Sequence, residues 1–168
     1  MKNNPLSRLS LLAATFVVAT VGSAMAVSPA PAGIDPDIAE ATFRYQFMHN
    51  ESGQQSGAHV YCIGFERKTA LGGWDDPPPS LVSRFSDVSP PVKAVSECSA
   101  SQHGVRDRET GADGLIFEIS TVTCTSDTQC VAEGGYYEAG LSASGDSYYL
   151  EKTNGKWAVT KDVMHWIS

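Results

Sequence analysis

A few serine side chains in this 168-residue sequence stand in a pattern that suggests chemistry. Residues 140–145, Gly-Leu-Ser-Ala-Ser-Gly, approach the Gly-x-Ser-x-Gly elbow that exposes a nucleophilic serine between a strand and a helix. The second glycine is not at the required place, and the segment is expected to turn between two strands. We therefore expect neither Ser142 nor Ser144 to be catalytic.

Histidine and acidic residues lack the spacing of a metal site. The four histidines form no His-x-His or His-x-x-x-His pair, and none lies at ligand spacing from a cysteine. Asp107, Glu109 and Asp113 begin like a calcium loop, but Gly111 stands where an oxygen ligand is needed. Glycine-rich phosphate loops and dinucleotide fingerprints are also missing from the sequence. Neither a metal nor a cofactor is predicted.

Four cysteines, an even number, favour two disulfides over a metal site, since there is no Cys-x-x-Cys pair. Cys124 and Cys130 flank a polar Thr-Ser-Asp-Thr-Gln stretch that should turn between two strands. A disulfide fits across the base of such a hairpin, because facing strand positions bring their Cβ atoms close together. We therefore predict the pairs Cys124–Cys130 and Cys62–Cys98.

Residues 1–26 read as a cleavable signal peptide. Lys2 and Arg8 supply the positive charge, an apolar stretch too short for a good membrane span follows, and Ala24 and Ala26 stand at the −3 and −1 positions of a cleavage site. The alternative is an uncleaved N-terminal anchor. No cysteine lies near the cleavage site, so a lipid anchor is not expected.

Cleavage would leave residues 27–168, with two of the twelve basic residues removed and all nineteen acidic ones kept, which gives a formal charge of −9. Such a charge argues against binding to nucleic acid or to an anionic membrane surface. It fits a basic protein partner, and it equally fits a protein that is merely kept soluble. The predicted compartment is the periplasm or the extracellular space, with no membrane span after cleavage.

The mature chain should begin with a linker, residues 27–34, followed by one domain, residues 35–168. Asp35-Pro36 is a typical helix start, and the helix should end near Asn50. Its apolar stripe is predicted to contain Ile38, Ala41, Thr42, Tyr45 and Met48.

Most of the remaining elements are predicted to be strands. Asn154-Gly155 gives the strongest hairpin signal. Residues 102–114 are expected to be a loop, and residues 81–85 a short helix. The expected strands are residues 58–66, 92–98, 115–124, 129–141, 147–152 and 156–167. The predicted fold class is therefore α+β: one long N-terminal helix packed on a curved antiparallel sheet of five or six strands.

This pattern, with the Gly-Lys-Trp-Ala-Val strand at 155–159 and the terminal Trp-Ile-Ser at 166–168, resembles the cystatin-like and NTF2-like α+β superfamily. Together with Tyr61-Cys62 and Ser96-Glu97-Cys98, it also resembles small exported bacterial proteins of uncharacterised function. The superfamily contains enzymes, ligand-binding domains and inhibitors, so the resemblance implies little about activity.

The resemblance implies a pocket between helix and sheet. Enzymes of the NTF2-like kind hold a few polar residues there, and in this chain the candidates are Tyr45, His49, His59, Tyr61 and Glu118. Alternation places Tyr61 on the same strand face as His59, whereas it favours the solvent face for Glu118.

Trp74 lies in a Gly-Gly-Trp-Asp-Asp-Pro segment. A large aromatic side chain in such a loop is either an exposed contact residue for a partner or a plug that packs the loop onto the domain.

These observations favour an exported, non-enzymatic binding or inhibitor-type protein, whose partner could be another protein of the cell envelope. Residues 142–148 faintly resemble the Ser-Gly-Ser-Gly-x-x-Tyr loop of periplasmic C-type lysozyme inhibitors, although Asp146-Ser147 stands where that family has a basic residue. A turn between strands explains the same residues. The alternatives are an NTF2-like hydrolase or isomerase with a small pocket, and an accessory or structural protein of the envelope. No oligomeric state is predicted.

Overall fold

The computed structural model describes residues 33–53, 57–70 and 72–168. The predicted signal peptide and most of the predicted linker therefore lie outside the described residues. Within the described ranges, no helix has both the length and the apolar character needed to cross a membrane.

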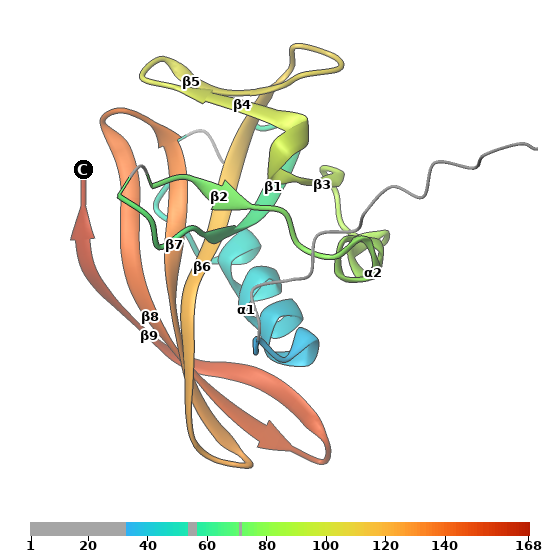
Figure 1. Ribbon diagram of the computed structural model, residues 1–168, viewed down its shortest axis with the longest axis vertical. Helices are drawn as coiled ribbons and strands as arrows, with labels where there is room; N and C mark the ends of the chain where they lie inside the picture. Colours follow the sequence, from blue (N-terminus) through green and yellow to red (C-terminus); the bar gives the residue numbers. More distant parts are fainter. Residues whose placement is uncertain (1–32, 54–56, 71) are drawn as a thin grey trace, which may run out of the picture.

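A nine-stranded mixed sheet forms the body of the protein (Figure 1). The four long strands make an antiparallel meander: β6 (Asp113–Ser126), β7 (Gln129–Ala139), β8 (Ser142–Thr153) and β9 (Lys156–Ile167). On the other side of β6, β1 (Val60–Glu66) runs parallel to it, and β1 in turn pairs with β2 (Trp74–Asp75) and β3 (Val92–Ala94). A hairpin of β4 (Cys98–Ser101) and β5 (Gly104–Asp107) joins the start of β6.

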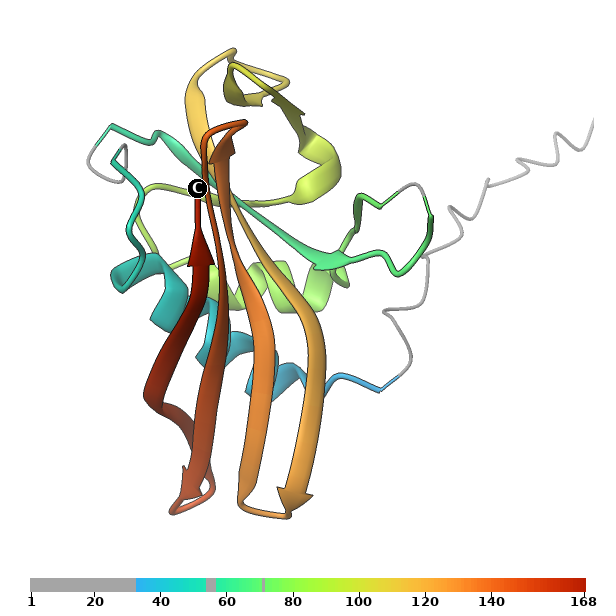
Figure 2. The ribbon, with the colours of Figure 1, turned by 90° about the vertical axis from the view of Figure 1, so that its left-hand side faces the viewer.

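Helical structure is confined to short segments of the described chain. Helix α1 (Pro36–Met48) has 13 residues and α2 (Pro79–Val82) has four. Two 3₁₀ turns follow, at Ser83–Phe85 and Val95–Glu97. Figure 2 shows α1 lying across one face of the meander.

The predicted fold class is wrong. The sheet has nine strands instead of five or six, it is mixed instead of antiparallel, and α1 is not a long helix. The parallel pairing of β1 with β6 joins segments about fifty residues apart, which a local pattern does not encode. Strands of two to four residues, such as β2, β3 and β5, are too short to show a period, and β5 lies inside the segment predicted to be a loop.

The ends of α1 agree with the sequence, but its buried face does not. The carboxylate of Asp35 accepts a hydrogen bond from the backbone N–H of Asp37, and Pro36 occupies the first turn, as predicted. Met48, in the predicted stripe, is 74% exposed, whereas Phe43 and Phe47 are buried. The buried face is rotated by about one residue, because two phenylalanines four positions apart bury more apolar area than the stripe that includes Met48.

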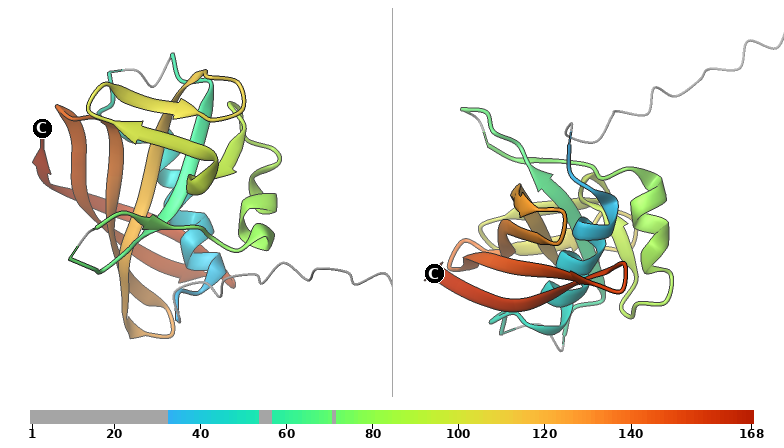
Figure 3. Two further views of the ribbon diagram at one scale, coloured as in Figure 1. Left: turned by 45° about the horizontal axis from the view of Figure 1, so that its top comes forward. Right: turned by 90° about the horizontal axis from the view of Figure 1, so that it is seen from below.

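The main core lies between α1 and the face of the sheet that we call the inner face, which carries Tyr61, Phe117, Tyr136 and Tyr148. Phe47 packs on Tyr61 and Phe117 with ring centroids 5.1 Å apart in both pairs. Seen from below, β8 and β9 curve alongside α1 (Figure 3). The opposite, outer face carries Cys62 and Ile116 in a smaller core.

Both predicted disulfides, Cys62–Cys98 and Cys124–Cys130, are present. Cys124 and Cys130 occupy paired positions of β6 and β7, as the hairpin argument required. The described cysteines are all paired. Two disulfides indicate an oxidising environment, as expected of an exported protein.

At three glycines in β7 and β8, a side chain would collide with a neighbouring strand or with an indole ring. A Cβ atom at Gly134 would collide with the main-chain oxygen of Glu118, and one at Gly135 would collide with that of Ser144. At Gly145 the missing side chain is replaced by the indole of Trp166, which lies against the outer face. Aromatic cover of a strand glycine is a recognised way to stabilise a curved sheet.

We expect Gly134→Ala to destabilise the protein by about 2 kcal/mol or more, because the new methyl group meets rigid backbone instead of a movable side chain. Gly53→Ala is the matched control, since nothing lies within 4 Å of a Cβ at that position. Urea unfolding of the two variants would check this. Equal stability would show that β7 and β6 do not need the close approach.

Candidate functional site

An open cleft of about 340 Å³ lies between the end of α1 and the inner face of β6–β9. Its lining comes from the last turn of α1 and the residues after it, and from one or more positions on each of the four long strands: Tyr45, Gln46, Met48, His49, Asn50, Glu51, Phe117, Gly135, Tyr136, Ser144, Asp146, Tyr148, Asp162 and Met164. The volume is in the range of small-molecule sites.

Gln46 is the most buried polar residue of the cleft, with 1% of its surface exposed. Its Nε2 donates to the main-chain oxygen of Glu118 at 3.0 Å and to that of Gly135 at 3.4 Å. Two donor contacts fix the orientation of the amide, and Oε1 is then left buried without a hydrogen-bond partner among the described residues. A buried acceptor of this kind costs free energy until a donor reaches it.

Asp146 places a carboxylate in the wall of the cleft, with 8% of its surface exposed. The hydroxyl of Ser144, two residues earlier on the same face of β8, donates to its Oδ2 at 2.5 Å. Burial raises the pKa of Asp146, and the negative charge of Asp162 on β9 adds to this. The ionised form of Asp146 is therefore less favourable here than that of an aspartate in water.

Aromatic side chains surround these polar groups. The hydroxyl of Tyr45 donates to Oδ1 of Asp162 at 3.0 Å, which links α1 to β9. The ring of Tyr45 stacks on His49 with centroids 4.1 Å apart and meets Tyr148 edge-on at 6.0 Å. Burial, together with the charge of Asp146, raises the pKa of Tyr148, so its phenol stays protonated at neutral pH.

The charge of the cleft has one sign. Glu51, Asp146 and Asp162 contribute carboxylates, and no lysine or arginine is found among its described lining residues. The described part of the chain contains no group of three His, Cys, Asp or Glu side chains placed to hold a metal ion. The arrangement can neutralise a positive charge and accept a hydrogen bond, with aromatic rings around both groups.

The five residues predicted to line a pocket are not all brought together. Tyr45 lines the cleft, and so does His49. Tyr61 is in the core, where burial raises the pKa of its phenol, and His59 is exposed just before β1 begins. Glu118 carries its side chain on the outer face of β6, the face that alternation favoured, but there it is half-buried.

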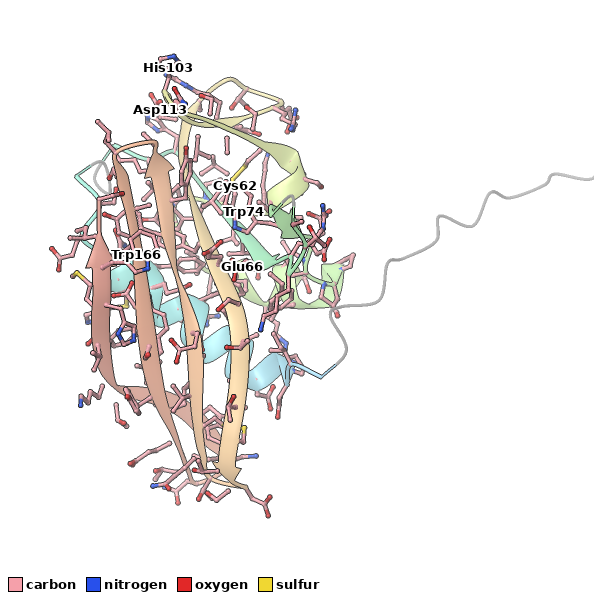
Figure 4. The ribbon with its side chains drawn as sticks, turned by 60° about the vertical axis from the view of Figure 1, so that its left-hand side comes forward. Cys62, Glu66, Trp74, His103, Asp113 and Trp166 are labelled. Carbon is pink, nitrogen blue, oxygen red and sulfur yellow. A yellow bond between two sulfur atoms is a disulfide. The ribbon has the colours of Figure 1, made fainter. Side chains whose placement is uncertain are left out.

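Trp74 covers Glu118 on the outer face. Its indole Nε1 donates to Oε2 of Glu118, and a Cβ at Gly64 would lie 3.1 Å from the Cβ of Trp74. Burial is the main cause that raises the pKa of Glu118; the bond from Trp74 opposes the shift and the charge of Glu66 increases it. Figure 4 shows Trp74 and Glu66 in front of the sheet, with α1 behind it. Of the two predicted roles, this half-buried position fits the side chain that packs its loop onto the domain.

The sequence reasoning missed Gln46, Ser144, Asp146, Tyr148 and Asp162. Ser144, Asp146 and Tyr148 are alternate residues of β8, so alternation would have placed them on one face had the strand been expected to begin at Ser142 instead of Ser147. Gln46 lies between two phenylalanines of the buried helix face, and a polar residue in that position is the signal that was available.

The outer face has a smaller hollow of about 210 Å³, lined in part by Glu66, Glu118, Glu133, His165 and Trp166. Beside it, Oγ of Ser147 lies 2.6 Å from Nε2 of His165 and donates to Glu133 Oε2 at 2.8 Å. A catalytic triad requires the acid on the other ring nitrogen of the histidine, whereas Glu133 approaches the same Nε2, at 3.9 Å. Ser147 is also only 4% exposed, so this cluster is not arranged for nucleophilic attack.

No family model matches this chain, and neither does any curated protein or solved structure. The resemblance to the cystatin-like and NTF2-like superfamily therefore stays a prediction.

Asp146→Asn should stabilise the protein by about 1 kcal/mol at pH 7, because it removes a buried charge from a site that lacks a counter-ion. The raised pKa means that native Asp146 binds its proton more tightly than the unfolded chain does. The contribution of Asp146 to wild-type stability is therefore fully present below the usual pKa of an aspartate and is lost as the pH rises through the native pKa. The difference between Asp146→Asn and wild type should accordingly vanish near pH 3.5.

Urea unfolding at the two pH values measures this. Glu151→Gln, which removes a charge from an exposed position of the same strand outside the cleft, is the matched control and should stay within about 0.5 kcal/mol of wild type. A lower stability of Asp146→Asn at pH 7 would contradict the burial penalty.

Proposed function

We propose that this chain is an exported, non-enzymatic binding protein that holds a small molecule in the cleft between α1 and β6–β9. The observation that carries the proposal is the combination of an open cleft with a buried, unpartnered acceptor in its lining, Oε1 of Gln46. A ligand that donates to this oxygen would remove the cost of leaving it unpaired.

The proposed compartment is the periplasm or the extracellular space. Its support is the pair of disulfides together with the signal-peptide pattern of residues 1–26. A ligand reaching the protein there comes from outside the cytoplasm, which favours capture or delivery as the role of the cleft.

One observation favours the enzyme alternative. Asp146 is a buried carboxylate with a raised pKa in a cleft, next to Ser144, and such a group can act as a general base or acid. The two functions differ in what happens to the ligand. A binding protein returns it unchanged after prolonged incubation, whereas an enzyme with Asp146 as its acid or base converts it and loses this ability in Asp146→Asn.

The binding function is tested with a fragment library that contains anionic, neutral and cationic compounds, observed by saturation-transfer NMR. Met48 lies at the mouth of the cleft and is 74% exposed, so Met48→Lys changes the entrance without disturbing the core. Leu141→Lys is the matched control, because Leu141 is 88% exposed and is not among the lining residues.

We expect some fragments to bind the wild type and Leu141→Lys equally and Met48→Lys differently. A library from which no fragment binds, or fragments that bind all three proteins alike, would overturn the proposal that this cleft is a binding site.

A further inference from the structure

We infer that the cleft binds an organic cation that carries at least one N–H donor, such as a primary ammonium group on a small hydrophobic frame. The inference deepens the proposed function and rests on it, since it names the class of molecule that the same cleft holds.

The charges of the cleft favour a cationic ligand. Asp146 is almost fully buried, its side-chain hydrogen bonds come from the neutral hydroxyls of Ser144 and Tyr148, and Asp162 on the neighbouring strand adds a second negative charge. A buried carboxylate without a cation nearby is unfavourable, and a bound cation would supply what the described lining lacks. An anionic ligand would add to the repulsion.

The hydrogen bonding of Gln46 favours a ligand with a donor, independently of charge. Oε1 of Gln46 can only accept, and the contacts of Nε2 with Glu118 and Gly135 prevent the amide from turning its donor toward the ligand. The ligand must therefore bring a donor. An ammonium group meets both conditions at once, because it carries a positive charge and N–H groups on the same atom.

Aromatic and thioether side chains make up much of the cleft lining. Tyr45, Tyr136, Tyr148 and His49 line the same cleft as the acids, and aromatic faces attract cations. Met48 and Met164 stand partly exposed at the cleft, where flexible thioether side chains adapt to different apolar frames. These features fit a cation that has an apolar body more closely than a bare inorganic ion.

Four probes that share one ring separate these requirements. Benzylamine offers a positive charge and N–H donors, whereas benzyltrimethylammonium offers the positive charge alone. Benzyl alcohol offers an O–H donor without charge, and phenylacetate is an anion. We expect benzylamine to bind about tenfold or more tightly than benzyl alcohol, since a hydrogen bond to a charged group is worth about 1.5 kcal/mol or more. Benzyltrimethylammonium should fall between the two, and phenylacetate should not bind.

Substitutions show which residue causes the preference for benzylamine over benzyl alcohol. Asp146→Asn should reduce the preference for benzylamine over benzyl alcohol to about threefold or less, because the remaining charges are more exposed and better screened. Glu151→Gln is the matched control, since it removes one charge from an exposed position on the same strand outside the cleft. If Asp146→Asn does not fold, Met48→Lys serves in its place and should weaken benzylamine more than benzyl alcohol.

The outcomes separate the two proposals. Equal affinity for benzylamine, benzyl alcohol and phenylacetate would overturn the cation inference and leave a binding cleft. A preference for benzylamine that Glu151→Gln reduces as much as Asp146→Asn would also overturn it, since the effect would then be one of overall charge. Failure of all four probes, together with failure of the fragment library, would remove the binding function itself.

Discussion

The side-chain amide of Gln46 donates to main-chain oxygens of two neighbouring strands, and this contact requires α1 to lie close to the backbone of the sheet. The approach is possible because the facing positions on β7 are glycines: a Cβ at Gly134 would lie 3.2 Å from Nε2 of Gln46. The Nε2 end of the amide is thus bonded to the sheet, while Oε1 has no hydrogen-bond partner among the described residues. The cleft, its unpaired acceptor and the position of the α1 C-terminus all depend on this arrangement.

The two faces of the sheet differ in function: the outer face carries stabilising contacts, and the inner face carries the main core and the cleft. On the outer face, a disulfide, the bond from Trp74 to Glu118 and the cover of Gly145 by Trp166 hold strands and loops together. On the inner face, the rings of Phe47, Tyr61 and Phe117 fill the space between α1 and the sheet. Beyond these rings the lining changes to acids, tyrosines and methionines. Two polar side chains of this lining, Gln46 and Asp146, are nevertheless almost fully buried, at a cost in free energy that a bound ligand would offset.

Features encoded by a few adjacent residues were predictable from the sequence. The N-cap at Asp35 and the Asn154-Gly155 turn, where both residues have positive φ angles, are local and were predicted correctly. The Cys124–Cys130 pair follows from one hairpin, and Cys62–Cys98 followed by elimination. The parallel pairing of β1 with β6 depends on contacts far apart in sequence and was missed, and with it the mixed sheet.

The site was less predictable than the fold, because it lies where four strands and a helix end meet. The faces of Tyr61 and Glu118 depend on which side of the sheet α1 covers, and the sequence alone does not specify this. In the sequence, Asp146 stands out only because the lysozyme-inhibitor loop has a basic residue there. Its burial results from the register of β8 against β7 and β9, which the sequence pattern does not specify. Gln46 shows how a single polar residue in an apolar helix stripe can mark a site.

The most direct test is a titration of ¹⁵N-labelled protein with benzylamine, followed by two-dimensional NMR. The account predicts that backbone amides of residues 45–50, 135–136, 144–148 and 162–164 shift together and fit one dissociation constant. Shifts confined to the outer-face hollow around Glu66, Glu133 and Trp166, or no shifts at all, would contradict it.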